Sequence, residues 1–258
     1  MPTEILSGGS GVTDEFLGID FARVSLGEAI GIVSQMAQSE AFQYVLTPNV
    51  DHVVMLFPTQ DDDRAVQFRA AYRAAAMRVC DSRILRALAK LKGIDIETVP
   101  GSDLSASLFR DIFCVGHKVA IVGGDADTVS SLQNLYAGLD YVQHIPPMGI
   151  LANRPAIDAV VKFVGDERAD FTLFAIGAPQ SEIIAHRCME EKRASGVGIC
   201  IGASIEFLLG HKARAPVWMQ RSGLEWAFRL ISEPRRLWRR YLVDGPRIFI
   251  MAARWRRQ

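Results

Sequence analysis

The chain has 258 residues and a formal net charge of zero, because 29 lysines and arginines balance 29 aspartates and glutamates. Its length accommodates one large α/β domain or two small ones, and its apolar share of 49% is ordinary for a globular protein. The neutrality combines two opposite parts: residues 212–258 hold 12 basic against 3 acidic side chains, and the residues before them hold 17 against 26. This asymmetry favours an anionic partner for the basic part, either a nucleic acid, a phosphate ligand or an anionic membrane surface.

Several classes of protein are excluded by what the sequence lacks. Cys80, Cys114, Cys188 and Cys200 show neither CxxC nor His/Cys ligand spacing, so we expect buried thiols in a reducing compartment rather than disulfides. No stretch approaches about 18 uncharged apolar residues, which excludes a spanning helix. The first 16 residues contain acids and no apolar run, unlike a signal peptide. We therefore expect a cytoplasmic protein.

Short apolar runs bounded by turn residues alternate with helical patterns along the chain. Ser25 and Glu28 have the spacing of a capping box and predict the start of a helix. Apolar residues at three- and four-residue steps favour helices over 62–76 and 82–93, and a further helical pattern covers 125–138. The predicted strands are 44–49, 77–81, 118–124, 139–145, 170–177 and 196–202. This alternation predicts an α/β fold with a mostly parallel sheet and helices on both faces.

Polar residues and glycines follow most of the predicted strands. In parallel sheets, ligands bind beyond the carboxyl ends of the strands, and glycines there let the backbone approach a phosphate near a helix N-terminus. Pro179 also has the position typical of a first helical turn. The residues selected in this way are Thr47, Asn49, Asp51, Asp81, Ser82, Gly123, Gly124, Asp125, Gly177, Pro179, Ser181, Glu182, Gly202 and Ser204.

Each of these signals also has an ordinary structural interpretation. Gly123 and Gly124 form either a nucleotide-binding turn or a common turn before a helix, and they fall short of GxGxxG. Asp81 has the position of an N-cap, which is compatible with a place in a ligand crevice. Asp51 and His52 resemble a metal pair, but adjacent residues on a helix point apart. Neither a histidine metal motif nor a serine-hydrolase motif is present.

A resemblance to a known family arises from eight segments in the family's order. They are 47–53, 80–85, 99–104, 119–124, 177–182, 196–210, 214–230 and 233–242. The most specific are RAPVW, GLEWAFRL and EPRRLWRRYL, all in the basic part of the chain. From about Leu17 onward the sequence resembles the WecG/TagA/CpsF glycosyltransferases, which form glycosyltransferase family 26.

The resemblance implies a fold and a reaction. The fold is a Rossmann-like α/β core, here residues 1–210, with a C-terminal appendage, here the basic amphipathic residues 211–258. We expect this appendage to act as a lid and to dock on the membrane, because it combines a basic surplus with aromatic residues. The family transfers a sugar from a UDP-sugar to a polyprenyl-diphosphate-linked sugar at the cytoplasmic face of the membrane, with inversion at the anomeric carbon. A cytoplasmic protein held peripherally on the inner face of the plasma membrane is therefore expected, with a homo-oligomer left open.

The resemblance also assigns residues. The family's catalytic aspartate falls on Asp81, and the Thr and Asn of its T-x-N motif fall on Thr47 and Asn49. An inverting transfer needs a base for the acceptor hydroxyl, and one carboxylate at a strand end suits this role. No acidic pair is present for a metal, so we expect no metal or other cofactor, with arginines stabilising the diphosphate leaving group. The expected substrate-binding residues are Gly123, Gly124, Gly177, Pro179, Ser181, Glu182, Gly202, Arg214, Arg221, Arg229, Arg235 and Arg236.

The sequence departs from the family pattern at four positions, and two changed pocket positions bear on the donor sugar. Ser82 replaces a glycine after the aspartate, Ser181 replaces a glutamine, Thr98 replaces an arginine, and Glu206 replaces an aspartate. Together with HIPPMGI at 144–150, these changes favour the exopolysaccharide branch and a hexose such as glucose. The alternative is an N-acetylmannosaminyltransferase of teichoic acid, common antigen or capsule synthesis.

The basic aromatic appendage has more than one interpretation. Its arginines either close over the UDP diphosphate or form an amphipathic membrane surface, and a solvated helix packed on the core is the plainer reading. The aromatic and apolar residues considered for the membrane surface are Trp238, Tyr241, Phe249, Ile250 and Trp255. A nucleic-acid-binding protein is a rival from another class, but nothing in the core resembles an RNA-binding motif, so we expect no nucleic acid. An NAD-dependent oxidoreductase and an inactive membrane scaffold are further alternatives.

Overall fold

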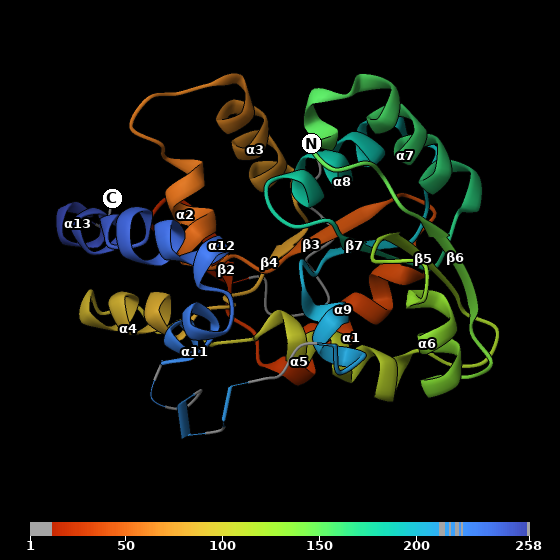
Figure 1. Cartoon of the computed structure of the whole chain (residues 1–258), viewed down its shortest axis with the longest axis horizontal. Coiled ribbons are helices and arrows are strands. Elements are labelled where there is room, and N and C mark those ends of the chain that lie inside the picture. The colour runs from red at the N-terminus through yellow and green to blue at the C-terminus, as the bar shows by residue number, and fades with distance from the viewer. Residues whose placement is uncertain (1–11, 212–214, 217, 220–221, 223, 257–258) are drawn as a thin grey trace.

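A six-stranded parallel sheet forms the centre of the molecule (Figure 1). The computed structural model describes residues 12–211, 215–216, 218–219, 222 and 224–256. The order across the sheet is β4-β3-β8-β7-β5-β6, and every pairing is parallel. The strands are β3 (Gln43–Leu46), β4 (Met77–Arg78), β5 (Lys118–Gly123), β6 (Asp140–His144), β7 (Phe171–Ala175) and β8 (Val197–Cys200). All six predicted strands and the α/β fold are confirmed.

Helices cover both faces of the sheet, as predicted. Successive residues of a strand enter different cores, since Tyr44 and Leu46 belong to one buried cluster and Val45 to the other. Strands buried on both faces read as continuous apolar runs, which is how the sequence revealed them. One face carries α3 (Asp63–Ala74), α7 (Arg154–Glu167) and α8 (Gln180–Glu191). The other face carries α1 (Leu26–Ala37), α5 (Gly101–Ser107), η1 (Leu108–Ile112), α6 (Thr128–Leu135) and α9 (Ser204–Leu208).

The hydrogen bonds at the N-termini of two helices test the capping residues predicted from the sequence. The capping box of α1 is confirmed, because Ser25 Oγ accepts from the N–H of Glu28 and the Glu28 carboxylate accepts from the N–H of Ser25. The N-cap of α4 (Arg83–Leu91) is Ser82, whose Oγ accepts from the N–H of Leu85 at 3.2 Å. The expectation that Asp81 caps this helix is therefore wrong. Because Ser82 takes that position, the carboxylate of Asp81 stays available for other contacts.

The sequence analysis missed a hairpin and misplaced one thiol. Strands β1 (Thr13–Phe16) and β2 (Ile19–Ala22) pair antiparallel around Leu17 and Gly18, both with positive φ. The hairpin lies next to β4, the edge strand, where Arg78 Nε donates to the Asp20 carbonyl at 2.8 Å. Covering an edge strand in this way protects it from other chains. Three cysteines are buried as expected, whereas Cys114 is exposed.

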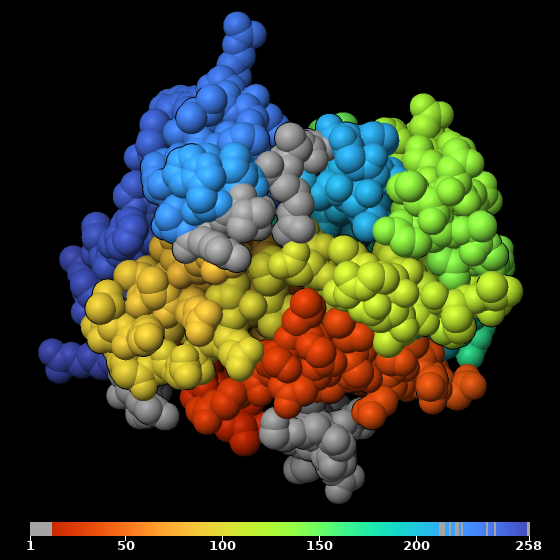
Figure 2. Space-filling view, turned by 90° about the horizontal axis from the view of Figure 1, so that it is seen from below, coloured from red at the N-terminus to blue at the C-terminus, as the bar shows by residue number. Residues whose placement is uncertain are grey.

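The C-terminal helices pack against the core at one end of the molecule (Figures 1 and 2). They are α11 (Glu225–Ser232), α12 (Pro234–Arg239), η3 (Arg240–Asp244) and α13 (Arg247–Arg254). Ile248 and Ala252 of α13 enter the core cluster that also contains residues of α2 (Val50–Leu56) and α4. Trp255 packs edge-on against Phe16 with ring centroids 5.2 Å apart, and its Nε1 donates to Glu15 at 3.3 Å. Among the described residues, no helix is both long and apolar enough to cross a membrane.

Candidate active site

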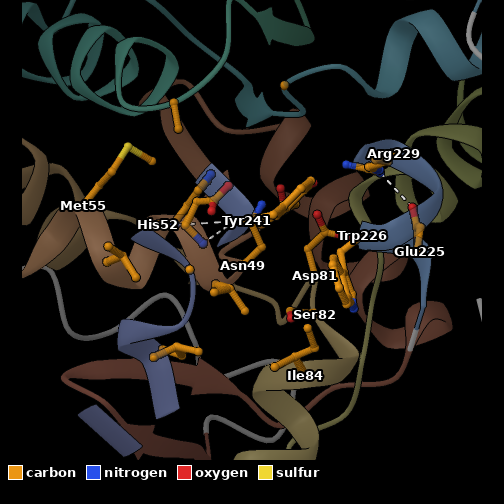
Figure 3. Close-up of a pocket in the computed structure, with 18 of the residues that line it drawn as sticks. Asn49, His52, Met55, Asp81, Ser82, Ile84, Glu225, Trp226, Arg229 and Tyr241 are labelled. Atoms are coloured by element: carbon orange, nitrogen blue, oxygen red, sulfur yellow. Dashed lines mark hydrogen bonds and ion pairs between the residues drawn. The ribbon is translucent and has the colours of Figure 1, made fainter. Parts of the chain in front are cut away.

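A cavity of about 870 Å³ opens beyond the carboxyl ends of β3, β4, β7 and β8. Its volume lies in the range of small-molecule binding sites, roughly 300–1,000 Å³. The core contributes one side of the lining and the C-terminal helices the other (Figure 3). Core residues of the lining include Thr47, Asn49, Asp81, Gly177, Glu182 and Gly202. C-terminal residues of the lining include Glu225, Trp226, Arg229, Tyr241, Arg247 and Phe249.

Asp81 is one of the residues that line the cavity. Its N–H donates to the Pro48 carbonyl at 2.9 Å, and its Oδ1 accepts from the N–H of Gly101, also at 2.9 Å. Burial raises the pKa of Asp81 to about 7, although the Gly101 N–H and the cation of Arg229 act in the opposite sense. Glu225 and Asp103 raise this pKa further. A carboxylate that gains and loses a proton near neutral pH, with part of its surface open to a cavity, suits general base catalysis.

Thr47 and Asn49 flank Pro48, whose carbonyl accepts from the N–H of Asp81. Thr47 is buried, and its Oγ1 donates to the Cys200 carbonyl at 3.1 Å, which joins the ends of β3 and β8. Asn49 caps α2, because its Oδ1 accepts from the backbone N–H of Asp51 at 3.0 Å. At Gly101 a Cβ atom would lie 3.2 Å from Thr47 Oγ1, so a glycine allows α5 to approach this closely. The three predicted catalytic residues therefore lie around one cavity.

A second, deeper acidic group lines the same cavity. Glu182 stands in the first turn of α8 and is buried, which raises its pKa to about 7. Its Oε1 lies 3.9 Å from His52 Nδ1, and that nitrogen lies 2.6 Å from the hydroxyl of Tyr72. Burial lowers the pKa of His52 to about 4, so the imidazole is neutral near pH 7. Within the part of the chain that the structure describes, Glu182 Oε2 has no hydrogen-bond partner.

The arginines of the site differ from the predicted set. Arg229 lines the cavity, donates from Nη2 to Glu225 at 2.8 Å and lies over the ring of Phe207 at 5.1 Å. Arg235 is exposed on α12 and does not line the cavity. The predictions for Arg214, Arg221 and the side chain of Arg236 lie outside the described residues.

Two lining arginines were missed by the sequence analysis. Arg83 is the first residue of α4, and its place two residues after Asp81 is the signal that could have identified it. Arg247 begins α13 and donates to the Phe57 carbonyl at 3.2 Å. Only the charge surplus of the C-terminal part pointed to Arg247.

Gly177, Glu182 and Gly202 line the cavity as predicted, whereas four other predicted binding residues of the core do not. Gly123 is the last residue of β5 and Gly124 follows it, and β5 lies beyond β7 in the sheet. The two glycines pack against Ala175 and Thr128. The turn that they form is not part of the cavity lining. Ser181 and Pro179, at the start of α8, are also absent from the lining, whereas Glu182 is part of it. The Ser181 hydroxyl donates to the Phe174 carbonyl at 3.3 Å.

These features are typical of an α/β enzyme that acts on a small anionic substrate. The cavity lies at the strand ends of a parallel sheet, and its lining contains a carboxyl group with a pKa of about 7 and an arginine that acts on that carboxyl group. Residues 15–258 match the family model described as the Glycosyl transferase WecG/TagA/CpsF family. The match spans nearly the whole chain, so the protein belongs to this family and is a glycosyltransferase. The resemblance found in the sequence is thereby confirmed.

Proposed function

We propose that this protein is an inverting glycosyltransferase of bacterial exopolysaccharide synthesis. It moves a hexose, with glucose favoured, from a UDP-sugar to a polyprenyl-diphosphate-linked sugar. The observation that carries this proposal is Asp81, a carboxyl group with a pKa of about 7 that lines a substrate-sized cavity beside an arginine. Membership of the glycosyltransferase family supports sugar transfer as the reaction of this site.

Asp81 acts as the general base. It accepts the proton of the acceptor hydroxyl while that oxygen forms a bond to the anomeric carbon of the donor. The bond between the anomeric carbon and the diphosphate oxygen breaks, and UDP leaves with the electron pair. Attack from the face opposite UDP inverts the anomeric centre.

Arginines of the cavity stabilise the leaving group. Negative charge grows on the UDP oxygen as the bond breaks, and fixed positive groups stabilise it. Arg229 is the first candidate because it lines the cavity and acts electrostatically on Asp81. Arg83 and Arg247 supply further positive charge to the same lining. Guanidinium groups bind phosphate bidentately, and on this basis we propose that transfer needs no metal ion.

The donor is proposed from departures from the family pattern that lie in the cavity. Ser82 replaces a glycine and Thr98 replaces an arginine, and both residues line the cavity. Ser181, which replaces a glutamine, lies outside the lining, where its hydroxyl donates to the Phe174 carbonyl. The two changed lining positions support a hexose over N-acetylmannosamine.

The C-terminal helices provide the membrane contact in this proposal. Trp238, Leu242, Phe249 and Ile250 are each more than half exposed, and basic residues such as Arg235 are interspersed among them. Exposed apolar side chains beside basic ones suit the anionic inner face of the plasma membrane, where the lipid-linked acceptor resides. Two residues considered earlier have other contacts: Tyr241 lines the cavity, and Trp255 packs on Phe16. A homo-oligomer stays a prediction.

One experiment tests the function directly. Membranes that carry lipid-linked acceptor are incubated with purified protein and a panel of labelled UDP-sugars that includes glucose, galactose and N-acetylmannosamine. We expect label to enter the lipid fraction from UDP-glucose. Transfer from UDP-N-acetylmannosamine alone would replace the proposed donor by the alternative one. Neither transfer nor hydrolysis of any UDP-sugar would contradict the proposed function.

A further inference from the structure

The proposed reaction gives no role to the aromatic side chains on the C-terminal side of the cavity. Trp226, in the first turn of α11, and Tyr241, in η3, both line the cavity, and their rings meet edge to face with centroids 6.3 Å apart. Figure 3 shows Trp226 beside Asp81. No described residue of α11 is buried, and Trp226 keeps part of its surface exposed. Its indole therefore does not anchor the helix in a core.

The position of Asp81, the proposed base, indicates which substrate lies next to the indole of Trp226. A general base must be within hydrogen-bond reach of the proton that it removes. The acceptor sugar, which carries the attacking hydroxyl, must therefore lie against Asp81. The faces of a pyranose ring present C–H groups that pack on a flat aromatic ring, while the hydroxyls at its rim remain free for polar partners. An indole beside a carboxylate offers both kinds of contact to one sugar.

The rim of the cavity supports the same assignment. Leu242 and Phe249 line the cavity, yet each has 56% of its surface exposed. They belong to the same C-terminal helices as Trp226. A prenyl chain attached to the acceptor would leave the cavity across these apolar side chains, whereas the donor has no lipid to place there. The C-terminal side of the cavity is thus the side that suits the acceptor.

We propose that Trp226 is a platform that holds the acceptor saccharide against Asp81. This role rests on the proposed function, because it assumes that Asp81 is the base. Stacking restrains the sugar ring without adding charge, so Trp226 contributes to acceptor affinity and to the orientation of the attacking hydroxyl. It contributes little to binding of the UDP-sugar.

Two substitutions at Trp226 test the platform. Trp226→Leu keeps an apolar side chain but removes the flat ring, and Trp226→Phe restores a ring. The acceptor is detergent-solubilised lipid-linked saccharide from membranes that support transfer, and KM is measured separately for acceptor and donor. We expect Trp226→Leu to raise the acceptor KM roughly tenfold, the size of a good aromatic contact, with the donor KM unchanged. Trp226→Phe should recover most of the affinity.

Controls separate this idea from a folding defect and from the proposed function. Ile231→Ala removes an apolar side chain that is 78% exposed on the same helix and does not line the cavity, so both KM values should stay at the wild-type level. Hydrolysis of UDP-sugar in the absence of acceptor should be equal in the wild type and in Ile231→Ala. Thermal unfolding reports folding of the two Trp226 variants, and Trp226→Phe keeps the test valid if the leucine variant does not fold.

The outcomes are distinct. An unchanged acceptor KM in a folded Trp226→Leu variant overturns the platform while leaving Asp81 as the base. A raised donor KM with an unchanged acceptor KM assigns Trp226 to the UDP-sugar and also overturns the proposal. A wild-type protein that transfers no sugar contradicts the proposed function itself.

Discussion

The core and the C-terminal helices line the same cavity but are built in opposite ways. Core strand residues such as Val45, Val122 and Leu173 have no exposed surface. Helix α11, in contrast, has no buried residue among those described. The core thus fixes Asp81 through the buried backbone that surrounds it, whereas the C-terminal side presents charged and aromatic groups at a solvated surface. We therefore expect substitutions in the two regions to have different effects on the protein.

The largest effect is expected at the base. Asp81→Asn removes the group that accepts the proton, so kcat should fall roughly 10²–10⁴-fold while UDP affinity stays near that of the wild type. Transfer assays and calorimetric titration with UDP measure the two quantities.

The neighbouring cap provides the matched control. Ser82→Ala should cost about 1 kcal/mol of stability through loss of the α4 cap but keep most of the transfer rate.

Because burial raises the pKa of Asp81, its stabilising contribution is present at low pH and is lost as pH rises through about 7. The Asp81→Asn variant should therefore be at least as stable as the wild type at pH 8. Near-normal turnover by this variant would remove Asp81 from the role of base.

The attachment of the C-terminal helices gives the next largest effect. Ile248 is 1% exposed and enters the core cluster, so Ile248→Ala should lower the free energy of unfolding by about 2–5 kcal/mol. Ile250, on the same helix, is 55% exposed, so Ile250→Ala should change it by less than about 0.5 kcal/mol. Urea unfolding measures both values. Equal effects would mean that α13 is not anchored in solution as it is in this structure.

The exposed side of the same helix should govern membrane binding. Replacing Phe249 and Ile250 by serine removes apolar surface and should weaken binding to anionic vesicles roughly tenfold. Binding of the wild type should also weaken as salt rises, because attraction to the lipid is screened beyond about 8 Å at physiological salt. Val115→Ser is the control, because Val115 lies on the surface of the α/β part of the chain, away from the C-terminal helices, and is 83% exposed. Unchanged sedimentation of the double variant with vesicles would contradict the docking proposal.

A smaller effect is expected on the pH dependence of the rate, because residues of the C-terminal helices act on the pKa of Asp81 in the core. The wild-type rate should fall as pH drops below about 7, because Asp81 must be ionised to act as a base. Glu225 raises this pKa and Arg229 lowers it. Glu225→Gln should therefore move the acidic limb of the kcat/KM profile to lower pH, and Arg229→Gln should move it to higher pH. If both variants shifted the profile in the same direction, the acidic limb would not report the pKa of Asp81 as set by Glu225 and Arg229.

The smallest effect is expected from metal removal. If arginines alone stabilise the diphosphate, the transfer rate should be the same before and after treatment with EDTA. Loss of activity that Mg²⁺ or Mn²⁺ restores would contradict that view, and it would assign the stabilisation to a metal ion bound with the substrate.

Local features of the sequence determined much of the fold. The six strands were predictable because strands of a parallel sheet are buried on both faces and therefore read as apolar runs. The start of α1 was predictable because the partners in its capping box, Ser25 and Glu28, are three residues apart. The hairpin at Leu17 and Gly18 was missed, although its Gly18 turn separates two short segments of strand.

Only the tertiary structure decided how the site is assembled. Asp81 and Ser82 are both good N-cap residues, and the backbone path after β4 determines that Ser82 takes this role. Gly123 and Gly124 lie at the end of a strand as Gly177 and Gly202 do, but the order of the sheet places them outside the cavity. Strand order is not encoded in any local pattern.

The encounter of Asp81 with the C-terminal helices is the clearest case. The sequence contained the basic surplus of residues 212–258 and the family's aspartate, but it did not indicate which side chains meet. Glu225, Trp226 and Arg229 line the cavity with Asp81. In the same C-terminal part of the chain, α11 contacts α12, and α13 contacts α2 and α4. Contacts between residues so far apart in the chain depend on the packing of whole helices, which the spacing of neighbouring residues does not specify.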